Sequence, residues 1–410
     1  MELKVKKVGL FESLRGIAAL VVVNEHLMKL FFVMAFSDAA MRSTEFGVLE
    51  EMSFPPFNML HNGAWAVCIF FVLSGYVLSY SFFKSSKTDG RELTGKVVAR
   101  YFRLAIPVTA SLIFVMILFS FSSIYFSDIV PLTQSKELYP YANKPTVVDM
   151  ISQGFGSALF NDNFSYNPPL WTMSVEMFGS LFIFALQAIF LTFRSHKYAW
   201  MIRMALYFCL IVLLFPTLYS GFVLGMLLCD CTLNNRVDSF LKQYSKYWVP
   251  FSLILGLFLC GYMIRGLYTN PYRYITINEF HPYYEYLYNI WGAFFLLSGI
   301  CYSETIKRIL EKPIFLSLGR ISFSLYLTHY TVMFSLTSYL YMVLDINEHT
   351  IRAFASIIIS LPVMFIVAKI FESYVNEPTI KLSQWIKNRI GKKVRSRREN
   401  GIPQEPVIVS

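Results

Sequence analysis

The sequence predicts an all-α, polytopic integral membrane protein with about ten transmembrane helices. Of its 410 residues, 55% are hydrophobic and only 15% are charged, and the mean hydropathy is +0.49. A soluble domain carries about 25% charged residues. The apolar residues gather in repeated runs of about twenty, the length of a helix that crosses a bilayer core. We therefore expect one membrane domain instead of several soluble ones.

The apolar runs set the approximate bounds of the ten expected spans. They are residues 14–36, 64–83, 104–126, 170–193, 199–215, 217–230, 248–266, 286–303, 321–343 and 353–375. The first run follows Lys4, Lys6 and Lys7, as in a signal peptide, but Asn24-Glu25-His26 interrupts it and no small-residue cleavage site follows. We expect a retained first helix. The segment at 150–160 is too short and too polar to span.

The basic residues predict the orientation. With the N-terminus inside, 27 of the 36 Lys and Arg residues fall on the inner side and 5 on the outer side. Cytoplasmic loops carry this excess of positive charge. Both termini are therefore expected in the cytoplasm of a multi-pass protein of the cell membrane.

The chain is expected to divide into a transmembrane domain at residues 1–378 and a basic cytoplasmic tail at 379–410. The net charge of +10 could indicate nucleic-acid binding, but most basic residues lie at the ends of apolar segments. The tail is expected to be attracted to anionic lipid, with about 1 kcal/mol per charge near the surface. We expect the lipid bilayer as a partner and no nucleic acid.

The cysteines do not indicate a disulfide framework or a metal site. All six lie within or at the ends of apolar segments, and none falls in an expected outer loop. Cys229 and Cys231 are close together, but no second pair of metal-ligand type accompanies them. We therefore expect no metal.

Ionisable residues inside membrane helices are costly, and the first span holds several. Arg15 and His26 are eleven residues apart, which places them on one helix face and about 16 Å apart along the axis. His26 would then lie near mid-membrane, where it either reacts or only hydrogen-bonds a neighbouring helix. Glu25 points about 100° away from His26, so we expect it to pair with another helix.

Five motifs occur in a fixed order along residues 10–375. They are Arg15-x10-His26, Phe70-Phe71-Val72-Leu73-Ser74-Gly75-Tyr76, Arg100-x-x-Arg103, Pro169-Leu170-Trp171-Thr172-Met173-Ser174-Val175-Glu176 and Ile321-Ser322-Phe323-Ser324-Leu325-Tyr326-Leu327-Thr328-His329. This ordered set resembles the membrane acyltransferases of the acyltransferase-3 family. Two positions depart from the family pattern. Ala66 stands where a glycine is frequent, and Met173 stands where leucine is common.

The resemblance implies an enzyme that transfers an acyl group, usually acetyl, from cytoplasmic acyl-CoA to an acceptor at the outer face. Acceptors in the family are typically hydroxyls of surface polysaccharide or lipid-linked glycan, and sometimes lipids or small natural products. Some members carry a fused outer hydrolase-like domain. This chain is expected to act alone or with a separate outer-face partner protein.

The residues themselves fit this chemistry. His26 can act as general base on the acceptor hydroxyl, an effect typically worth about 10²–10⁴-fold in rate. Glu176 is expected to lie at the depth of His26 and to orient it, with a structural ion pair as the alternative. Arg15, Arg100 and Arg103 suit the phosphates of acyl-CoA, because guanidinium groups match phosphate geometry. Ordinary topology anchoring is the alternative for Arg100 and Arg103.

Three further residues are weaker site candidates. A helical serine such as Ser174 more often bonds a backbone carbonyl than reacts. His329 is expected about 12 Å from the start of its span, shallower than His26, where it lines the site or only packs. His61, in an outer loop, is expected to be solvated or to face the acceptor. The competing function is a transporter whose buried charges line a path for a small polar or acylated solute.

Overall fold

The computed structural model describes residues 2–32, 57–85, 88–135, 137, 144–263, 272 and 283–392, and this part of the chain contains helices and loops but no strand. The first half holds α1 (Glu2–Phe31), η4 (Phe57–His61), α3 (Gly63–Lys84), α4 (Gly90–Ser120), α5 (Phe126–Thr133), α6 (Val147–Ser152), η5 (Gln153–Ser157), α7 (Ala158–Phe160), η6 (Pro168–Leu170) and α8 (Trp171–Thr192). The second half holds α9 (Ala199–Leu213), α10 (Tyr219–Leu233), α11 (Asn235–Gln243), α12 (Ser245–Cys260), α13 (Tyr283–Tyr302), α14 (Glu304–Leu310), α15 (Pro313–Val332), η9 (Met333–Thr337), α16 (Ser338–Val343), α17 (His349–Phe371), η10 (Glu372–Asn376) and α18 (Glu377–Lys392).

The expected all-helical class is confirmed for the described residues, and each of the ten expected spans overlaps a helix. Four helical stretches are long and apolar enough to cross a membrane: Gly63–Lys84, Gly90–Ser120, Pro168–Thr192 and His349–Gly391. Four shorter helices are also apolar. The total of ten spans therefore stays a prediction. The outer ends of the first and seventh expected spans, residues 33–36 and 264–266, lie outside the described residues.

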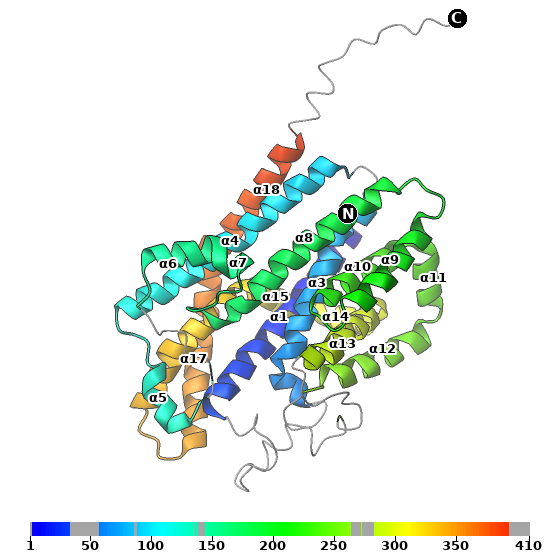
Figure 1. The fold of residues 1–410 in the computed structure, drawn as a ribbon. Coiled ribbons are helices and arrows are strands. Elements are labelled where there is room, and N and C mark those ends of the chain that lie inside the picture. The colour runs from blue at the N-terminus through cyan, green and yellow to red at the C-terminus, as the bar shows by residue number, and fades with distance from the viewer. Residues whose placement is uncertain are drawn as a thin grey trace, which may run out of the picture.

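Helices α1 and α15 lie against each other along much of their length (Figure 1). A Cβ atom on Gly16 would come within 2.7 Å of the Gly319 backbone nitrogen, so the two backbones nearly touch. Ten residues further along both helices, the rings of His26 and His329 are 5.4 Å apart between centroids. Each helix advances by ten residues in the same direction between the two contacts. The helices therefore run parallel and remain together for about 15 Å.

A second close contact joins α3 and α10. A Cβ atom on Gly75 would lie 2.1 Å from the carbonyl oxygen of Phe222, and one on Gly225 would lie 2.0 Å from that of Val72. Small residues let helix backbones approach in this way, and they are enriched at helix interfaces in membranes. Gly75 belongs to the second sequence motif, so this motif contributes helix packing.

The segment before α8 packs on the outside of α4, and only its last residues enter the bundle. Its short helices α6, η5 and α7 pack on α4, where Gly154 meets Thr109 and the Tyr101 hydroxyl donates to the Phe155 carbonyl at 2.7 Å. η6 is fully buried, and the Asn167 amide just before it donates to the Leu327 carbonyl of α15 at 2.9 Å. Helix α8 consequently begins inside the bundle and not at its surface.

Helices α17, η10 and α18 form one continuous helical run. α18 packs along the first part of α4, and both extend from the bundle at the end where the N-terminus lies (Figure 1). Gly95 of α4 allows this contact, because a Cβ there would already lie 3.0 Å from the Lys387 carbonyl. The expected boundary at 378/379 falls within α18, which belongs to the packed structure. The tail from residue 393 lies outside the described residues.

The α1–α15 contact predicts that Gly319→Ala destabilises the fold. The new Cβ would lie 2.3 Å from the Glu12 carbonyl oxygen, so α1 must shift, and overpacking of this kind typically costs about 1–3 kcal/mol. Thermal unfolding in detergent measures the effect. Gly391→Ala is the matched control, because no atom lies within 4 Å of its Cβ position. Equal stability of the two variants would contradict the close contact.

Candidate functional site

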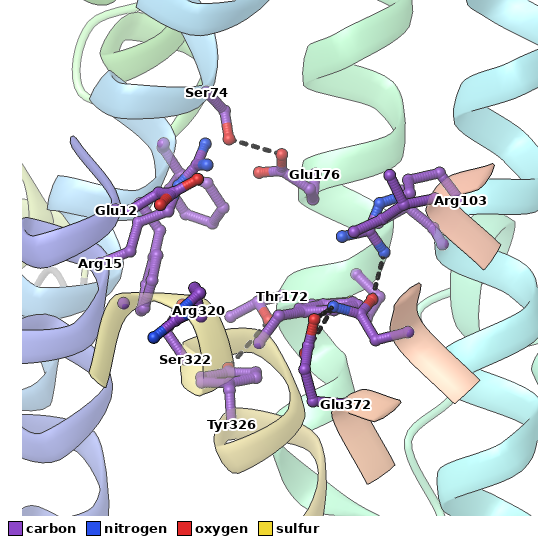
Figure 2. Close-up of a pocket in the computed structure, with 18 of the residues that line it drawn as sticks. Glu12, Arg15, Ser74, Arg103, Thr172, Glu176, Arg320, Ser322, Tyr326 and Glu372 are labelled. Atoms are coloured by element: carbon purple, nitrogen blue, oxygen red, sulfur yellow. Dashed lines mark hydrogen bonds between the residues drawn. The ribbon is translucent and has the colours of Figure 1, made fainter. Parts of the chain in front are cut away.

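A cavity of about 350 Å³ lies between α1, α3, α4, α8, α15, η10 and α18. Its size falls in the range of small-ligand pockets, about 300–1,000 Å³. The charged side chains that line it are Glu12, Arg15, Arg100, Arg103, Glu176, Arg320, Glu372 and Glu377. Figure 2 shows Arg15 on one side of this space and Arg103 on the other. All three arginines singled out in the sequence thus meet in one place.

Arg100 and Arg103 lie inside a helix and not at its beginning. The third span was expected to start at residue 104, whereas α4 begins at Gly90. The Arg100 guanidinium donates to the Glu176 carboxylate and, at 2.9 Å, to the Ser180 hydroxyl, both on α8. The Arg103 guanidinium donates to Asn376 Oδ1 at 2.5 Å on η10. The two arginines therefore reach different walls of the same cavity.

Arg15 differs from the other two arginines. It lines the cavity from α1, yet within the described part of the chain it makes no hydrogen bond or ion pair. A guanidinium carries five N–H donors, so Arg15 keeps its donors available for a ligand. Glu12, one helical turn earlier, lines the same cavity.

Two of the four carboxylates that line the cavity are held by hydrogen bonds. Glu176 accepts from the Ser74 hydroxyl at 2.6 Å as well as from Arg100. Glu372 accepts from the Ser324 hydroxyl at 2.7 Å and from the Asn376 amide at 2.7 Å. Buried charges are tolerated when they are paired and hydrogen-bonded, and this pairing fixes the walls of the site (Figure 2).

The expected contact between Glu176 and His26 is absent. Glu176 pairs with Arg100 and lines the cavity together with Arg15, which precedes His26 by about 16 Å along α1. The expected depth of Glu176 assumed that its helix starts at the membrane surface, but α8 starts inside the bundle. Glu176 therefore lies at the level of Arg15, and the alternative considered for it, an ion pair with another helix, is what the structure contains.

His26 lies in a second group of polar side chains, beyond the cavity. Its Nδ1 is 3.1 Å from Oε1 of Glu137, a residue in the segment after α5. The ring of His26 also lies 5.1 Å from that of Tyr330, whose hydroxyl donates to Glu137 Oε2 at 2.8 Å. Glu137 was not among the expected site residues. It belongs to no sequence motif and lies in a polar loop, where acidic residues are ordinary.

His329 stands beside His26 and not at a shallower level. Helix α15 starts at Pro313, eight residues before the expected span, so His329 is about 24 Å from the helix start. It is fully buried, and its Nδ1 lies 2.8 Å from the Tyr326 carbonyl and 3.0 Å from that of Leu325. Nδ1 must therefore carry the proton. Within the described residues, Nε2 of His329 is buried without a hydrogen-bond partner.

Tyr326 separates the cavity from the two histidines. It lines the cavity, and its ring centroid is 6.1 Å from that of His329, one turn along α15. Its hydroxyl lies 2.9 Å from Thr172 Oγ1 and 2.9 Å from the Pro169 carbonyl oxygen, and the bond to Thr172 is drawn in Figure 2. The Pro169–Glu176 motif thus contributes one wall of the cavity and the support for Tyr326.

The remaining candidates lie away from the cavity. Glu25 pairs at 2.5 Å with Lys29 of its own helix, not with another helix as expected. Ser174 donates to Asp162 Oδ1 at 3.0 Å. His61 is buried, with 2% of its surface exposed, and so is not the solvated residue that was expected. Burial lowers the pKa of His61 to about 4, so this imidazole is neutral at physiological pH.

Taken together, these features define a helical membrane protein with an ion-paired cavity on one side of Tyr326 and a histidine pair on the other. A family model described as an acyltransferase domain matches residues 10–369. The chain belongs to this acyltransferase-3 family and is a membrane acyltransferase. No curated protein and no solved structure matches it.

The buried ion pair generates a prediction for stability. Glu176→Ala leaves Arg100 uncompensated at the cavity wall, and breaking a buried pair costs about 3–5 kcal/mol. Adding Arg100→Ala removes the orphaned charge, so the double variant should lose less stability than the sum of the two single variants. Thermal unfolding in detergent measures all three. Lys242→Ala is the control: its lysine is 68% exposed in an ion pair with Asp238, so the substitution should change stability little. Additive stability losses for the Arg100 and Glu176 substitutions would contradict an interaction between the two residues.

Proposed function

We propose that this acyltransferase moves an acyl group, in the simplest case acetyl, from cytoplasmic acyl-CoA to a hydroxyl of a surface glycan or another outer-face acceptor. The observation that carries the proposal is the convergence of Arg15, Arg100 and Arg103 on one cavity that ends at Tyr326, directly before His26 and His329. Binding and reaction thus have separate places along one pair of helices.

Acyl-CoA is the donor that fits the cavity. Its pyrophosphate is anionic, and arginine binds phosphate through two parallel N–H bonds. Arg15 supplies free donors, while Arg100 and Arg103 are held in place by Glu176 and Asn376. We propose that the cavity opens to the cytoplasm, because the 27-to-5 excess of basic residues predicts that both termini lie on that side. Acyl-CoA would then enter from the compartment that contains it.

The distances along α1 fit the reach of the donor. Arg15 and His26 are about 16 Å apart along the helix axis, a span on the order of a pantetheine arm. With its phosphates at Arg15, acyl-CoA would extend its thioester as far as Tyr326, whose ring adjoins that of His329 beside His26. The acceptor would approach His26 from the other side, since His26 does not line the cavity and its side chain is 18% exposed.

The proposed reaction is a direct transfer. His26 removes the proton of the acceptor hydroxyl while the hydroxyl oxygen forms a bond to the thioester carbonyl carbon. The tetrahedral intermediate then collapses as the C–S bond breaks. The ester stays on the acceptor, and the CoA thiolate leaves and takes the proton from His26. Each proton and electron pair is accounted for by these groups, so no further reactant is needed.

A transporter for a small polar or acylated solute is the alternative function. A transport path needs access from both sides, whereas the cavity ends at the hydrogen-bonded Tyr326. Consumption of acyl-CoA by the wild-type chain separates the two functions, because a transporter leaves the thioester intact.

Arg15→Ala should weaken acyl-CoA binding. Hydrogen bonds to charged groups contribute about 1.5–3 kcal/mol, so Kd should rise about tenfold or more. Isothermal titration of the purified protein with acetyl-CoA measures this change. Arg308→Ala is the control, since Arg308 is exposed on α14 and outside the cavity. The same affinity in the Arg15 variant as in the control would remove Arg15 from the donor site.

His26→Ala should lower the rate of acyl transfer by about 10²–10⁴-fold, because the general base is lost, while acetyl-CoA binding stays close to that of the wild type. The rate is measured in native-host membranes, which contain the natural acceptor, as label transferred from [¹⁴C]acetyl-CoA to the membrane fraction. His196→Ala, an exposed histidine outside the site, should retain the wild-type rate. Transfer by the His26 variant at the wild-type rate would show that the histidine is structural.

A further inference from the structure

The reaction proposed above depends on how the His26 ring is held, and the structure gives it a partner that no sequence motif contains. His26 Nδ1 and Glu137 Oε1 are 3.1 Å apart. An ionised carboxylate only accepts hydrogen bonds, so Nδ1 carries the proton in this contact. In neutral His26 the lone pair is then on Nε2, which is the atom that must take the proton of the acceptor hydroxyl.

Glu137 is itself held in place. The Tyr330 hydroxyl donates to its other carboxylate oxygen at 2.8 Å. The Glu137 backbone N–H donates to Ser135 Oγ at 3.3 Å, and that hydroxyl donates to the Lys29 carbonyl of α1 at 3.2 Å. The loop residue is therefore tied to α1 and α15, the same two helices that carry His26 and His329.

The accessibility of the two partners fits a base and its support. The Glu137 side chain is 5% exposed, whereas that of His26 is 18% exposed. The carboxylate is thus shielded while the imidazole can still be reached. Burial alone would raise the pKa of Glu137, but the contact with His26, the nearby Lys29 charge and the Tyr330 hydroxyl bring it below its ordinary value. The group is ionised at neutral pH.

The other carboxylates that the sequence offered as partners of His26 are engaged elsewhere. The Lys29 ammonium donates to Glu25 Oε1 at 2.5 Å. Glu176 accepts hydrogen bonds from Arg100 and Ser74. Within the described residues, Glu137 is accordingly the carboxylate that contacts His26.

We propose that Glu137 is the positioning residue of the acyl transfer, an inference that rests on the proposed role of His26 as general base. It keeps His26 in the Nδ1–H tautomer, aims Nε2 at the acceptor hydroxyl, and stabilises the imidazolium that forms when His26 takes the proton. A carboxylate has the same relation to histidine in Ser-His-Asp enzymes, where it orients the ring and does not itself react. The support of the base thus comes from the loop between α5 and α6, on the acceptor side of Tyr326.

The test compares Glu137→Gln with wild type in native-host membranes supplied with [¹⁴C]acetyl-CoA. The amide oxygen of the glutamine can still accept the hydrogen bond from His26 Nδ1 but carries no charge. We therefore expect kcat to fall by about 10²-fold or more, while KM for acetyl-CoA stays unchanged. Asp128→Asn, an exposed acidic residue on α5, is the matched control and should retain the wild-type rate. Tyr330→Phe should lower kcat less than Glu137→Gln.

A double-variant cycle separates positioning from general stabilisation. If Glu137 acts through His26, Glu137→Gln should cause no further loss in the His26→Ala background, because residues that act as a unit are not additive. A Glu137→Ala variant should regain part of its rate when formate supplies a carboxylate. The inference would be overturned if the rate losses of the two substitutions multiply in the double variant, or if kcat is unchanged in Glu137→Gln. Wild-type membranes that do not consume acetyl-CoA would instead overturn the proposed function, and this inference with it.

Discussion

The close parallel contact between α1 and α15 is the constraint on which the rest of the structure depends. Gly16 and Gly319 bring the two backbones together at one level, and His26 and His329 meet ten residues further along. Neither helix could shift without separating both pairs. Arg15 and His26 both lie on α1, and the contact with α15 holds Tyr326 and His329 beside them, so the cavity and the histidines keep a constant separation. Glycine at the crossing is what permits this approach.

The second constraint is the compensation of charge inside the bundle. Arg100 is bound by Glu176, and Arg103 is bound by an asparagine that Glu372 holds in turn. These contacts join α4 to α8 and to η10, so the ion pair and the hydrogen bonds that line the cavity also connect the helices around it. Arg15 alone among the three motif arginines has no partner within the described residues. The guanidinium of Arg15 thus remains available in the cavity, which suits an anionic donor.

The helical class and the family could be predicted from the sequence, and the three arginines of the site were found by their motifs. Hydropathy and motif order depend on local composition, which a sequence displays directly. The partner of His26 could not be found in this way. The depth of Glu176 was wrong because residues 167–170 are buried in the bundle, and a sequence gives no sign that a segment before a helix is buried by its neighbours. Glu137 was missed for the same reason: its role depends on a tertiary contact and not on a pattern.

The central claim is that acyl-CoA binds in the cavity at Arg15 and extends towards His26. The most direct measurement is a cryo-electron microscopy structure of the chain in nanodiscs with a non-hydrolysable acetyl-CoA analogue. The account predicts phosphate density beside Arg15, Arg100 and Arg103, with the acyl end at Tyr326 and facing His26. Density for the analogue at another surface, or a continuous open path through the cavity past Tyr326 with no analogue bound in it, would contradict the account.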